Sequence, residues 1–425
     1  MTHLQQDDIP SGTTGRYSLF ESLEASSDEI DICGLKIKTN AVDAFEVPRF
    51  SFLGSVKFAL GFIFLLPIRA VLMIAQCLII TIIYILVYPL IGPIDKPQNL
   101  FIRFLARSVG YIWARLNMLI LGFIYVREHG HPHRDAKLLV AGPHTSSIDM
   151  FYFIYKFGPS FAVGEFVSKA PFIGQLSRVY NNLVIDRKAT GNSTQFLENL
   201  KKRISEEDES GRSFPKVVIF PEGATGNGRS LNYFHSGAFV PGEPLQPIII
   251  KYPYISNCTA WSVRSWVSHF IIVMSQLTNW IDVTYLPLYV PSAVERDHPR
   301  LLAYNVKIAM SLQGELARTE LTYADRKEYE KQRKAALKCG YRMPQPRQRS
   351  LQYQNQREPL IPVDPGAIDI GPSWFFEGAS DHVFYSSQPL PPYEILYQLE
   401  YGKHSNASAS ENQHLRSGNE GSEFV

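Results

Sequence analysis

The 425-residue sequence has few cysteines and almost no excess of charge. Its 4 cysteines are scattered, with no close pair and no spacing typical of zinc ligands. This argues against a disulfide scaffold or a zinc site and fits a reducing compartment. The formal net charge of +2 gives no reason to expect a nucleic-acid partner. The first ten residues contain neither a basic nor an apolar stretch, so we expect no secretory signal peptide.

Basic residues are scarce near the start of the chain, where Arg16 is the only one before Lys36. We interpret residues 1–50, which are rich in Ser, Thr and acidic residues, as a mostly disordered tail. At the other end, residues 321–425 are expected to form a charged helix followed by a disordered tail. The sequence after Pro344 is rich in Gln, Pro, Ser and Asn, which is typical of disorder.

One long apolar run follows the first tail, and we expect residues 51–126 to form a membrane-anchoring helical region. Residues 70–91 carry no charge, and as a helix they would span about 33 Å, enough for the hydrocarbon core of a bilayer. Arg69 before this segment and Pro89 within it leave open whether it spans the membrane or forms a re-entrant hairpin. Residues 98–126 predict another helix, with three arginines that suit either an anionic membrane surface or a solvated face: Arg103, Arg107 and Arg115.

Between residues 127 and 320, short β-rich runs alternate with helical patterns, which predicts an α/β domain with a sheet buried on both faces. The predicted strands are 137–142, 161–167, 182–187, 216–220, 246–252 and 281–290. The predicted helices are 149–157, 171–180, 193–205, 299–313 and 325–338. The apolar segment 261–280 contains three tryptophans, and we expect it to form an in-plane helix at the membrane interface.

One histidine and one aspartate stand close together after the first predicted strand. His144 follows a Gly-Pro turn, and Asp149 opens the next predicted helix. A carboxylate in the first helical turn can orient the imidazole, which then acts as a general base near neutral pH. The spacing alone is weak evidence, because the same pattern occurs at His3 and Asp8. The alternative is that Asp149 only favours the helix dipole.

Two other predicted strands also end in residues suited to chemistry. The strand before FPEG stops at a proline and turns through glycines, and backbone N–H groups in such a turn can bind phosphate or an oxyanion. Arg187 stands at the end of the run 182–187, where it can bind a phosphate through two hydrogen bonds or form a surface ion pair. Active sites of α/β proteins lie at such sheet edges, so the three strand ends support one another.

Taken in order, these segments resemble the glycerophospholipid acyltransferases of the PlsC-like superfamily, and most closely the lysophosphatidylcholine acyltransferase branch. The likeness covers roughly residues 50–320. The matching motifs are His144 with Asp149, LVIDR (183–187), FPEG (220–223) and QPIII (246–250). The branch usually reads Glu-Gly-Thr-Cys where this chain has EGAT, so that the hydroxyl is displaced by one residue, to Thr225.

The resemblance implies a mixed central sheet flanked by helices, and an enzyme that transfers a fatty acyl group from acyl-CoA to the free hydroxyl of a lysophospholipid. It implies two catalytic residues, His144 and Asp149, and five substrate-binding residues: Arg187, Glu222, Gly223, Thr225 and Pro247. Neither a metal nor a cofactor is implied, since acyl-CoA is a co-substrate. We expect an endoplasmic reticulum membrane protein whose site faces the cytosol. Two alternatives stay open, namely a 1-acylglycerol-3-phosphate or glycerol-3-phosphate acceptor, or a non-catalytic relative that binds acyl-CoA or lysolipid.

Overall fold

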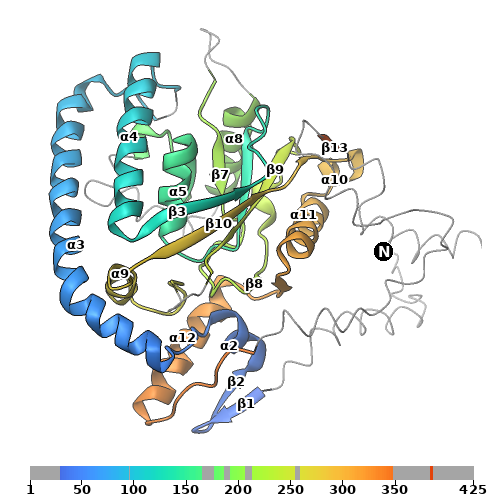
Figure 1. The fold of residues 1–425 in the computed structure, drawn as a ribbon. Coiled ribbons are helices and arrows are strands. Elements are labelled where there is room, and N and C mark those ends of the chain that lie inside the picture. The colour runs from blue at the N-terminus through green and yellow to red at the C-terminus, as the bar shows by residue number, and fades with distance from the viewer. Residues whose placement is uncertain are drawn as a thin grey trace, which may run out of the picture.

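The computed structural model describes residues 29–94, 96–164, 177–185, 192–205, 213–253, 259–347 and 383–385. A sheet of nine strands lies at the centre of the α/β domain (Figure 1). The strand order is β13-β11-β9-β4-β7-β5-β6, and β10 joins β9 to β3. The central strand β4 is parallel to both β9 and β7, whereas β9 is antiparallel to β10 and β11. The predicted mixed sheet with flanking helices is confirmed.

The strands of this sheet are β3 (Phe123–His129), β4 (Leu138–Gly142), β5 (Ser160–Gly164), β6 (Leu183–Ile185), β7 (Val217–Ile219), β9 (Leu245–Lys251), β10 (Asn279–Tyr285), β11 (Leu288–Val290) and β13 (Val383–Tyr385). The helices around it are α3 (Phe52–Val87), α4 (Leu100–Ile120), α5 (Ile148–Phe157), α8 (Asn192–Ser205), α9 (Trp266–Met274), α10 (Ala293–Asp297) and α11 (Pro299–Gly314). The 3₁₀ turns are η1 (Tyr88–Leu90) and η2 (Ser236–Ala238), and the short strands β8 (Ser230–Leu231) and β12 (Ala317–Arg318) form a separate pair.

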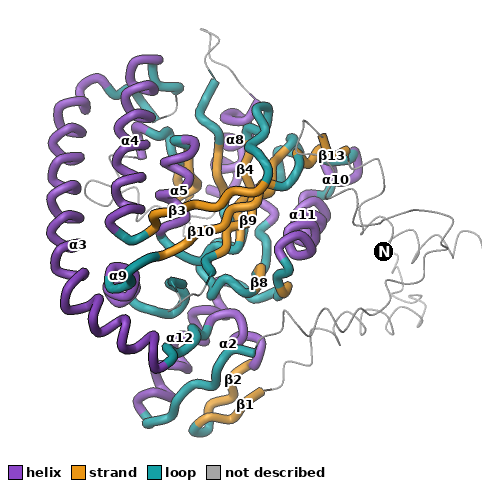
Figure 2. Tube along the Cα trace, in the orientation of Figure 1, coloured by secondary structure: helices purple, strands orange, loops and turns teal. Residues whose placement is uncertain are grey.

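The central strand β4 is buried along its whole length. Leu139 and Ala141 pack in one apolar cluster with α4 and α5, whereas Leu138 and Val140 pack in a second cluster with α8 and α11. Successive side chains of a strand point to opposite faces, so a continuous apolar run is what a strand covered on both faces requires. The helices accordingly cover both faces of the sheet (Figure 2).

Two predicted segments are divided differently in the structure. Segment 261–280 is not one helix, because α9 covers only nine of its residues and Trp280 already belongs to β10. The strand β10 has alternating burial and pairs with both β3 and β9. Because its first residues are already hydrogen-bonded in the sheet, the helix predicted over 261–280 cannot extend to residue 280. Segment 98–126 divides in the same way, since α4 ends at Ile120 and β3 begins after Gly122, whose φ of +86° makes the turn. The expected boundary after residue 126 therefore falls inside β3.

The other predicted elements agree with the described residues to different extents. The strands at 137–142, 216–220 and 246–252 and the helix at 149–157 are confirmed within one or two residues at each end as β4, β7, β9 and α5. The run 281–290 divides into β10 and β11. The ends of the strands predicted at 161–167 and 182–187, and most of the helix predicted at 171–180, lie outside the described residues.

The apolar run forms a single helix, α3, which continues through Pro67 and Arg69. No turn interrupts it before η1, so the structure favours one helix over a hairpin within residues 70–87, and α4 then returns beside it (Figure 1). With η1 it is long and apolar enough to cross a membrane, and only 11% of its most apolar window is buried. The expectation of a long apolar helix is confirmed.

Residues 29–45 were expected to belong to a disordered tail but form an ordered N-terminal unit. It consists of the hairpin β1 (Glu29–Ile32) and β2 (Leu35–Lys38) with α2 (Thr39–Phe45), and α12 (Tyr323–Lys338) packs against it. Glu46 accepts hydrogen bonds from the hydroxyl of Tyr329 (2.7 Å) and from Nε of Arg333 (2.8 Å). Glu46 and Tyr329 are 283 residues apart in the sequence, so a local pattern could not indicate this pairing.

Candidate active site

The predicted pair of His144 and Asp149 lies beyond the C-terminal end of β4. Asp149 stands in the first turn of α5, and its Oδ2 is 2.8 Å from Nδ1 of His144. The Asp149 side chain is fully buried, while 20% of the His144 side chain is exposed. An ionised carboxylate can only accept, so Nδ1–H donates to it, and Nε2 is the nitrogen left to take a proton from a substrate.

Asp149 accepts three further hydrogen bonds. The backbone N–H groups of Thr145 (3.0 Å) and Ser146 (3.2 Å) donate to Oδ2, and the hydroxyl of Tyr252 donates to Oδ1. Burial, together with the nearby Asp149 carboxylate, raises the pKa of Tyr252, so this hydroxyl keeps its proton and serves as a donor. These donors offset the cost of burying a carboxylate in the protein interior.

The FPEG motif stands after β7 and is tied directly to His144. The backbone N–H of His144 donates to Oε1 of Glu222 (2.8 Å), and the backbone carbonyl of His144 accepts from the N–H of Gly226 (2.9 Å). The other oxygen of Glu222 accepts from the backbone N–H (3.0 Å) and the side-chain amide (2.8 Å) of Asn232. Burial raises the pKa of Glu222, and the hydrogen bonds from Asn232 and His144 oppose this shift. The ring of Phe220 stacks on the imidazole of His144, with centroids 4.2 Å apart.

The remaining predicted substrate-binding residues are placed less closely around His144. Gly223 follows Glu222 with a φ of +61°, a conformation that favours glycine, and Thr225 is buried in the same turn. Pro247 lies inside the sheet, where it is paired with Val140 in β4 rather than placed beyond the strand end. Arg187 lies outside the described residues. The structure thus brings His144, Asp149 and Glu222 together and leaves Pro247 away from them.

Helix α9 reaches the same turn through His269, which the sequence analysis did not single out. Its Nε2 is 3.1 Å from Oγ of Ser146 and 3.3 Å from Oγ of Ser147, and its ring stacks on Trp261. Burial, with a smaller effect from Arg264, lowers the pKa of His269 to about 3, so the imidazole is neutral. No sequence signal marked His269 or Asn232, whereas Tyr252 could have been noticed as a polar residue at the end of a predicted strand.

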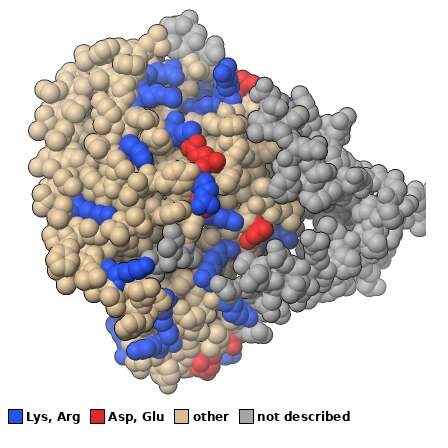
Figure 3. Space-filling view, in the orientation of Figure 1, with Lys and Arg blue, Asp and Glu red and all other residues tan. Residues whose placement is uncertain are grey.

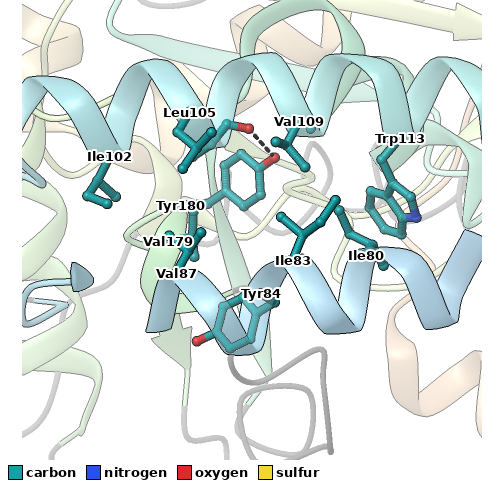
Figure 4. A pocket seen from close by; sticks show the side chains of 12 residues that line it. Ile80, Ile83, Tyr84, Val87, Ile102, Leu105, Val109, Trp113, Val179 and Tyr180 are labelled. Carbon is teal, nitrogen blue, oxygen red and sulfur yellow. Dashed lines mark hydrogen bonds between the residues drawn. The ribbon is translucent and has the colours of Figure 1, made fainter. Parts of the chain in front are cut away.

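An apolar cavity lies between α3 and α4, away from this constellation (Figure 4). The hydroxyl of Tyr180 donates to the backbone carbonyl of Ala106 (3.2 Å) beside it. None of its lining residues belongs to the site: Ile80, Ile83, Tyr84, Val87, Ile102, Leu105, Ala106, Val109, Gly110, Trp113, Val179 and Tyr180. Among the residues that the structure describes, no three His, Cys, Asp or Glu side chains are grouped to hold a metal ion.

Comparison with known proteins identifies the domain that carries this site. The family model "Acyltransferase" matches residues 124–251, which include His144, Asp149 and Glu222. The lysophospholipid acyltransferase LPEAT1 of Arabidopsis thaliana is 29% identical over 246 residues, which are 52% of this chain and 62% of that protein. The lysophospholipid acyltransferase LPCAT4 of Mus musculus is 31% identical over 202 residues, which are 47% of this chain and 38% of that protein.

The crystal structure of the 1-acyl-sn-glycerophosphate acyltransferase PlsC from Thermotoga maritima is 18% identical and covers 49% of this chain and 81% of that chain, with a TM-score of 0.32. The chain spans less than two thirds of the length of the two lysophospholipid acyltransferases above. The family match falls on the strands and turns that build the His144 site. Residues 124–251 of this chain are therefore similar to the acyltransferase family, and they include the His144 site.

Proposed function

We propose that this protein transfers a fatty acyl group from acyl-CoA to the free hydroxyl of a lysophospholipid, in phospholipid synthesis or remodelling. The observation that carries the proposal is the hydrogen bond from His144 to the fully buried Asp149 at the end of a central strand. The names of the similar proteins support a lysophospholipid acceptor. A lysophosphatidylcholine-type acceptor is favoured, because lysophosphatidylcholine acyltransferase 2 of Danio rerio is 29% identical over 63% of this chain.

In this mechanism Nε2 of His144 first accepts a proton and later donates it. Its Nε2 takes the proton of the acceptor hydroxyl while the oxygen attacks the thioester carbonyl of acyl-CoA. The tetrahedral intermediate then collapses, the C–S bond breaks, and the leaving thiolate receives the proton from Nε2. Asp149 holds Nδ1–H and stabilises the transient imidazolium. A thioester is already activated, so no covalent enzyme intermediate is needed.

The other motif residues are proposed to place the reactants. Both oxygens of Glu222 accept hydrogen bonds from the protein itself, so Glu222 acts by fixing the backbone of His144. The turn at Gly223, next to Glu222, is proposed to shape the site for the glycerophosphate of the acceptor. Arg187 is proposed to bind the phosphate of the acceptor in bidentate fashion, with Thr225 and Pro247 shaping the acceptor region.

A single assay tests the function. The purified full chain is supplied with labelled acyl-CoA and a panel of lysophospholipids, 1-acylglycerol 3-phosphate and glycerol 3-phosphate. We expect acylation of lysophospholipids and a loss of about 10²–10⁴ in turnover in His144→Ala. The exposed His129 provides the control, and His129→Ala should keep full activity. Preference for a glycerol phosphate would change the acceptor class, and binding of acyl-CoA without turnover would establish a non-catalytic relative.

We also propose that α3 holds the protein in the endoplasmic reticulum membrane. This helix packs along the α/β domain and does not project away from it. Three contacts hold α3 there. Gly61 touches the backbone of Ser275, Arg69 donates to the carbonyl of Met274 (2.8 Å), and the amide of Gln76 donates to Asn117 of α4 (2.7 Å). A helix bound to the domain over this length is suited to lie within one leaflet with its apolar outer face. The side of the molecule that carries α3 shows few charged residues (Figure 3).

The arginines of α4 do not add a basic stripe to this membrane surface. Arg103 donates to the carbonyl of Ser213 (2.7 Å), Arg107 to that of Phe157 (3.5 Å), and Arg115 to that of Ile124 (2.8 Å). Their side chains therefore bind the domain, and the interpretation as a face of a core helix is favoured over the membrane interpretation. The apolar residues of α3 are therefore proposed to anchor the protein in the membrane.

Acyl-CoA is cytosolic and too charged to cross a bilayer unaided, so we propose that the domain faces the cytosol. An in-plane α3 also leaves both ends of the chain on that side. Protease treatment of sealed microsomes should therefore remove tags at both Met1 and Val425, and the sequon at Asn192 should carry no sugar. Protection of only the Met1 tag would indicate that α3 spans the bilayer, and protection of the Val425 tag would overturn the cytosolic orientation.

A further inference from the structure

Cys33 and Cys339, which are far apart in the sequence, lie together on the surface of the N-terminal unit. Cys33 stands in the turn between β1 and β2, and Cys339 caps the C-terminal end of α12. Both are exposed, free thiols, and they are neighbours, since the apolar cluster beneath them joins Ile32, next to Cys33, with Ala336, one helical turn before Cys339. The sequence shows no close pair of cysteines, so this juxtaposition is produced by the fold alone.

Buried packing on both sides of the pair holds the two thiols in place. Ile32, next to Cys33, belongs to the same apolar cluster as Ala336 and Met343, which flank Cys339 in the sequence. The side-chain amide of Gln332 in α12 also donates to the carbonyl of Lys36 in β2 (3.3 Å). The hairpin and the end of α12 therefore meet through a packed interface, and the proximity of the thiols does not depend on a loose loop.

We propose that Cys33 and Cys339 are a site of reversible oxidation, at which they form a disulfide that fastens the N-terminal hairpin to α12. The oxidant is a low-molecular-weight disulfide such as oxidised glutathione. The thiolate of Cys339 attacks one sulfur of oxidised glutathione, which forms a mixed disulfide and releases one glutathione. Cys33 then loses its proton and attacks the sulfur of Cys339, which releases the second glutathione. Two protein thiols are oxidised, and one oxidised glutathione is reduced.

The state of the two thiols sets the conditions under which the bond forms. The neighbouring thiol of Cys339 raises the pKa of Cys33, and the carboxylate of Asp31 acts in the same direction. Because the thiolate is the reacting species, this shift slows the attack by Cys33. An exposed pair of this kind responds to the redox state of its surroundings, unlike a buried structural disulfide.

The N-terminal unit, which the proposed disulfide would fasten to α12, is connected to the candidate active site through Asn227. The backbone N–H of Asn227 donates to the carbonyl of Ala44 (2.9 Å), and its side-chain amide donates to the carbonyls of Asp43 (2.7 Å) and Glu46 (3.0 Å). The preceding residue, Gly226, donates to the carbonyl of His144. A bond that fastens the hairpin to α12 therefore fixes the unit that holds the segment after FPEG. The site itself does not rest on the acyltransferase proposal.

Peptide mapping without reduction tests whether the disulfide forms. The full chain, purified in detergent, is equilibrated in buffers of increasing ratio of oxidised to reduced glutathione and then digested. We expect a linked peptide that joins Cys33 to Cys339 and disappears on reduction. Both Cys33→Ser and Cys339→Ser should lose it, while Cys77→Ser, which removes another exposed thiol, should keep it. Separate glutathione adducts on the two thiols, with no linked peptide in the wild type, would overturn the site.

Two further measurements test whether the bond tightens the unit. Because the disulfide closes a loop that includes most of the described chain, oxidation should raise the melting temperature by about 5 °C or more in the wild type and leave Cys33→Ser unchanged. Amide hydrogen exchange should slow in peptides that contain residues 35–46 and 226–232. If the linked peptide forms while exchange at 226–232 is unaltered, the connection to the active site is refuted.

Discussion

Replacing Tyr252 by Phe removes one hydrogen bond from Asp149 and changes little else. Tyr252 is buried at the end of β9, and its hydroxyl is the only partner of Asp149 Oδ1 among the described residues. The other oxygen accepts from Nδ1 of His144 and from two backbone N–H groups. The variant therefore leaves one oxygen of a fully buried carboxylate without a donor, while the contact with His144 remains.

The expected size of the effect follows from the charge of the acceptor. A hydrogen bond to a charged group contributes about 1.5–3 kcal/mol, so the free energy of unfolding should fall by about that amount. This corresponds to a decrease of about 3–12 °C in melting temperature. A carboxylate held on one side only orients the imidazole of His144 less well, and we expect kcat to fall about 10-fold. The KM for acyl-CoA should stay the same, because the hydroxyl of Tyr252 faces Asp149 and not the solvent.

A matched variant separates positioning from stability. Tyr285 is buried in the same apolar cluster, and its hydroxyl shares a hydrogen bond with Tyr152 instead of Asp149. Tyr285→Phe should lower the melting temperature and leave kcat unchanged. Thermal unfolding and steady-state kinetics on both variants decide the matter. If Tyr252→Phe keeps full kcat, or if both variants lose it equally, Tyr252 does not position the catalytic pair.

Three further predictions concern the motif turns and the helix beside them. Glu222→Gln should lower activity at least about 10-fold in the acylation assay, because the amide has one oxygen for the donors of His144 and Asn232, and its NH₂ group would face the other. Arg187→Ala should raise KM for the phosphate-bearing acceptor more than for acyl-CoA, and Arg187→Lys should restore part of the loss. If the KM for the acceptor is the same in Arg187→Ala and in the wild type, Arg187 does not belong to the site. Because the pKa of His269 is about 3 in the folded protein and near 6.5 when unfolded, the unfolded state binds the extra proton between these values. The contribution of His269 to the unfolding free energy should therefore be largest above pH 6.5 and fall by about 1.4 kcal/mol per pH unit below it. Chemical denaturation at several pH values should show that the unfolding free energy of His269→Asn depends less steeply on pH than that of the wild type.

Local pattern was sufficient for the parts of the site that one strand and its turn define. The apolar run before His144 predicts a buried strand, and Asp149 at the start of α5 is in reach of the histidine because only the short turn between strand and helix separates them. The same holds for Glu222, which follows the short strand β7. The ordered unit at residues 29–45 escaped prediction because its apolar residues are covered by α12, which follows almost the entire domain in the sequence.

The residues that sequence reasoning missed depend on strand order and register. In the parallel pairing of β4 with β9, Gly142 lies opposite Ile249, so that Thr145 and Tyr252, each three residues further along, emerge at the same level of the sheet edge. A shift of one residue in this register would turn Tyr252 to the other face and away from Asp149. No periodicity within either strand contains the information that the two strands are neighbours, or in which register they pair. The donors around a buried carboxylate are therefore a property of the assembled sheet, while the carboxylate itself can be found in the sequence.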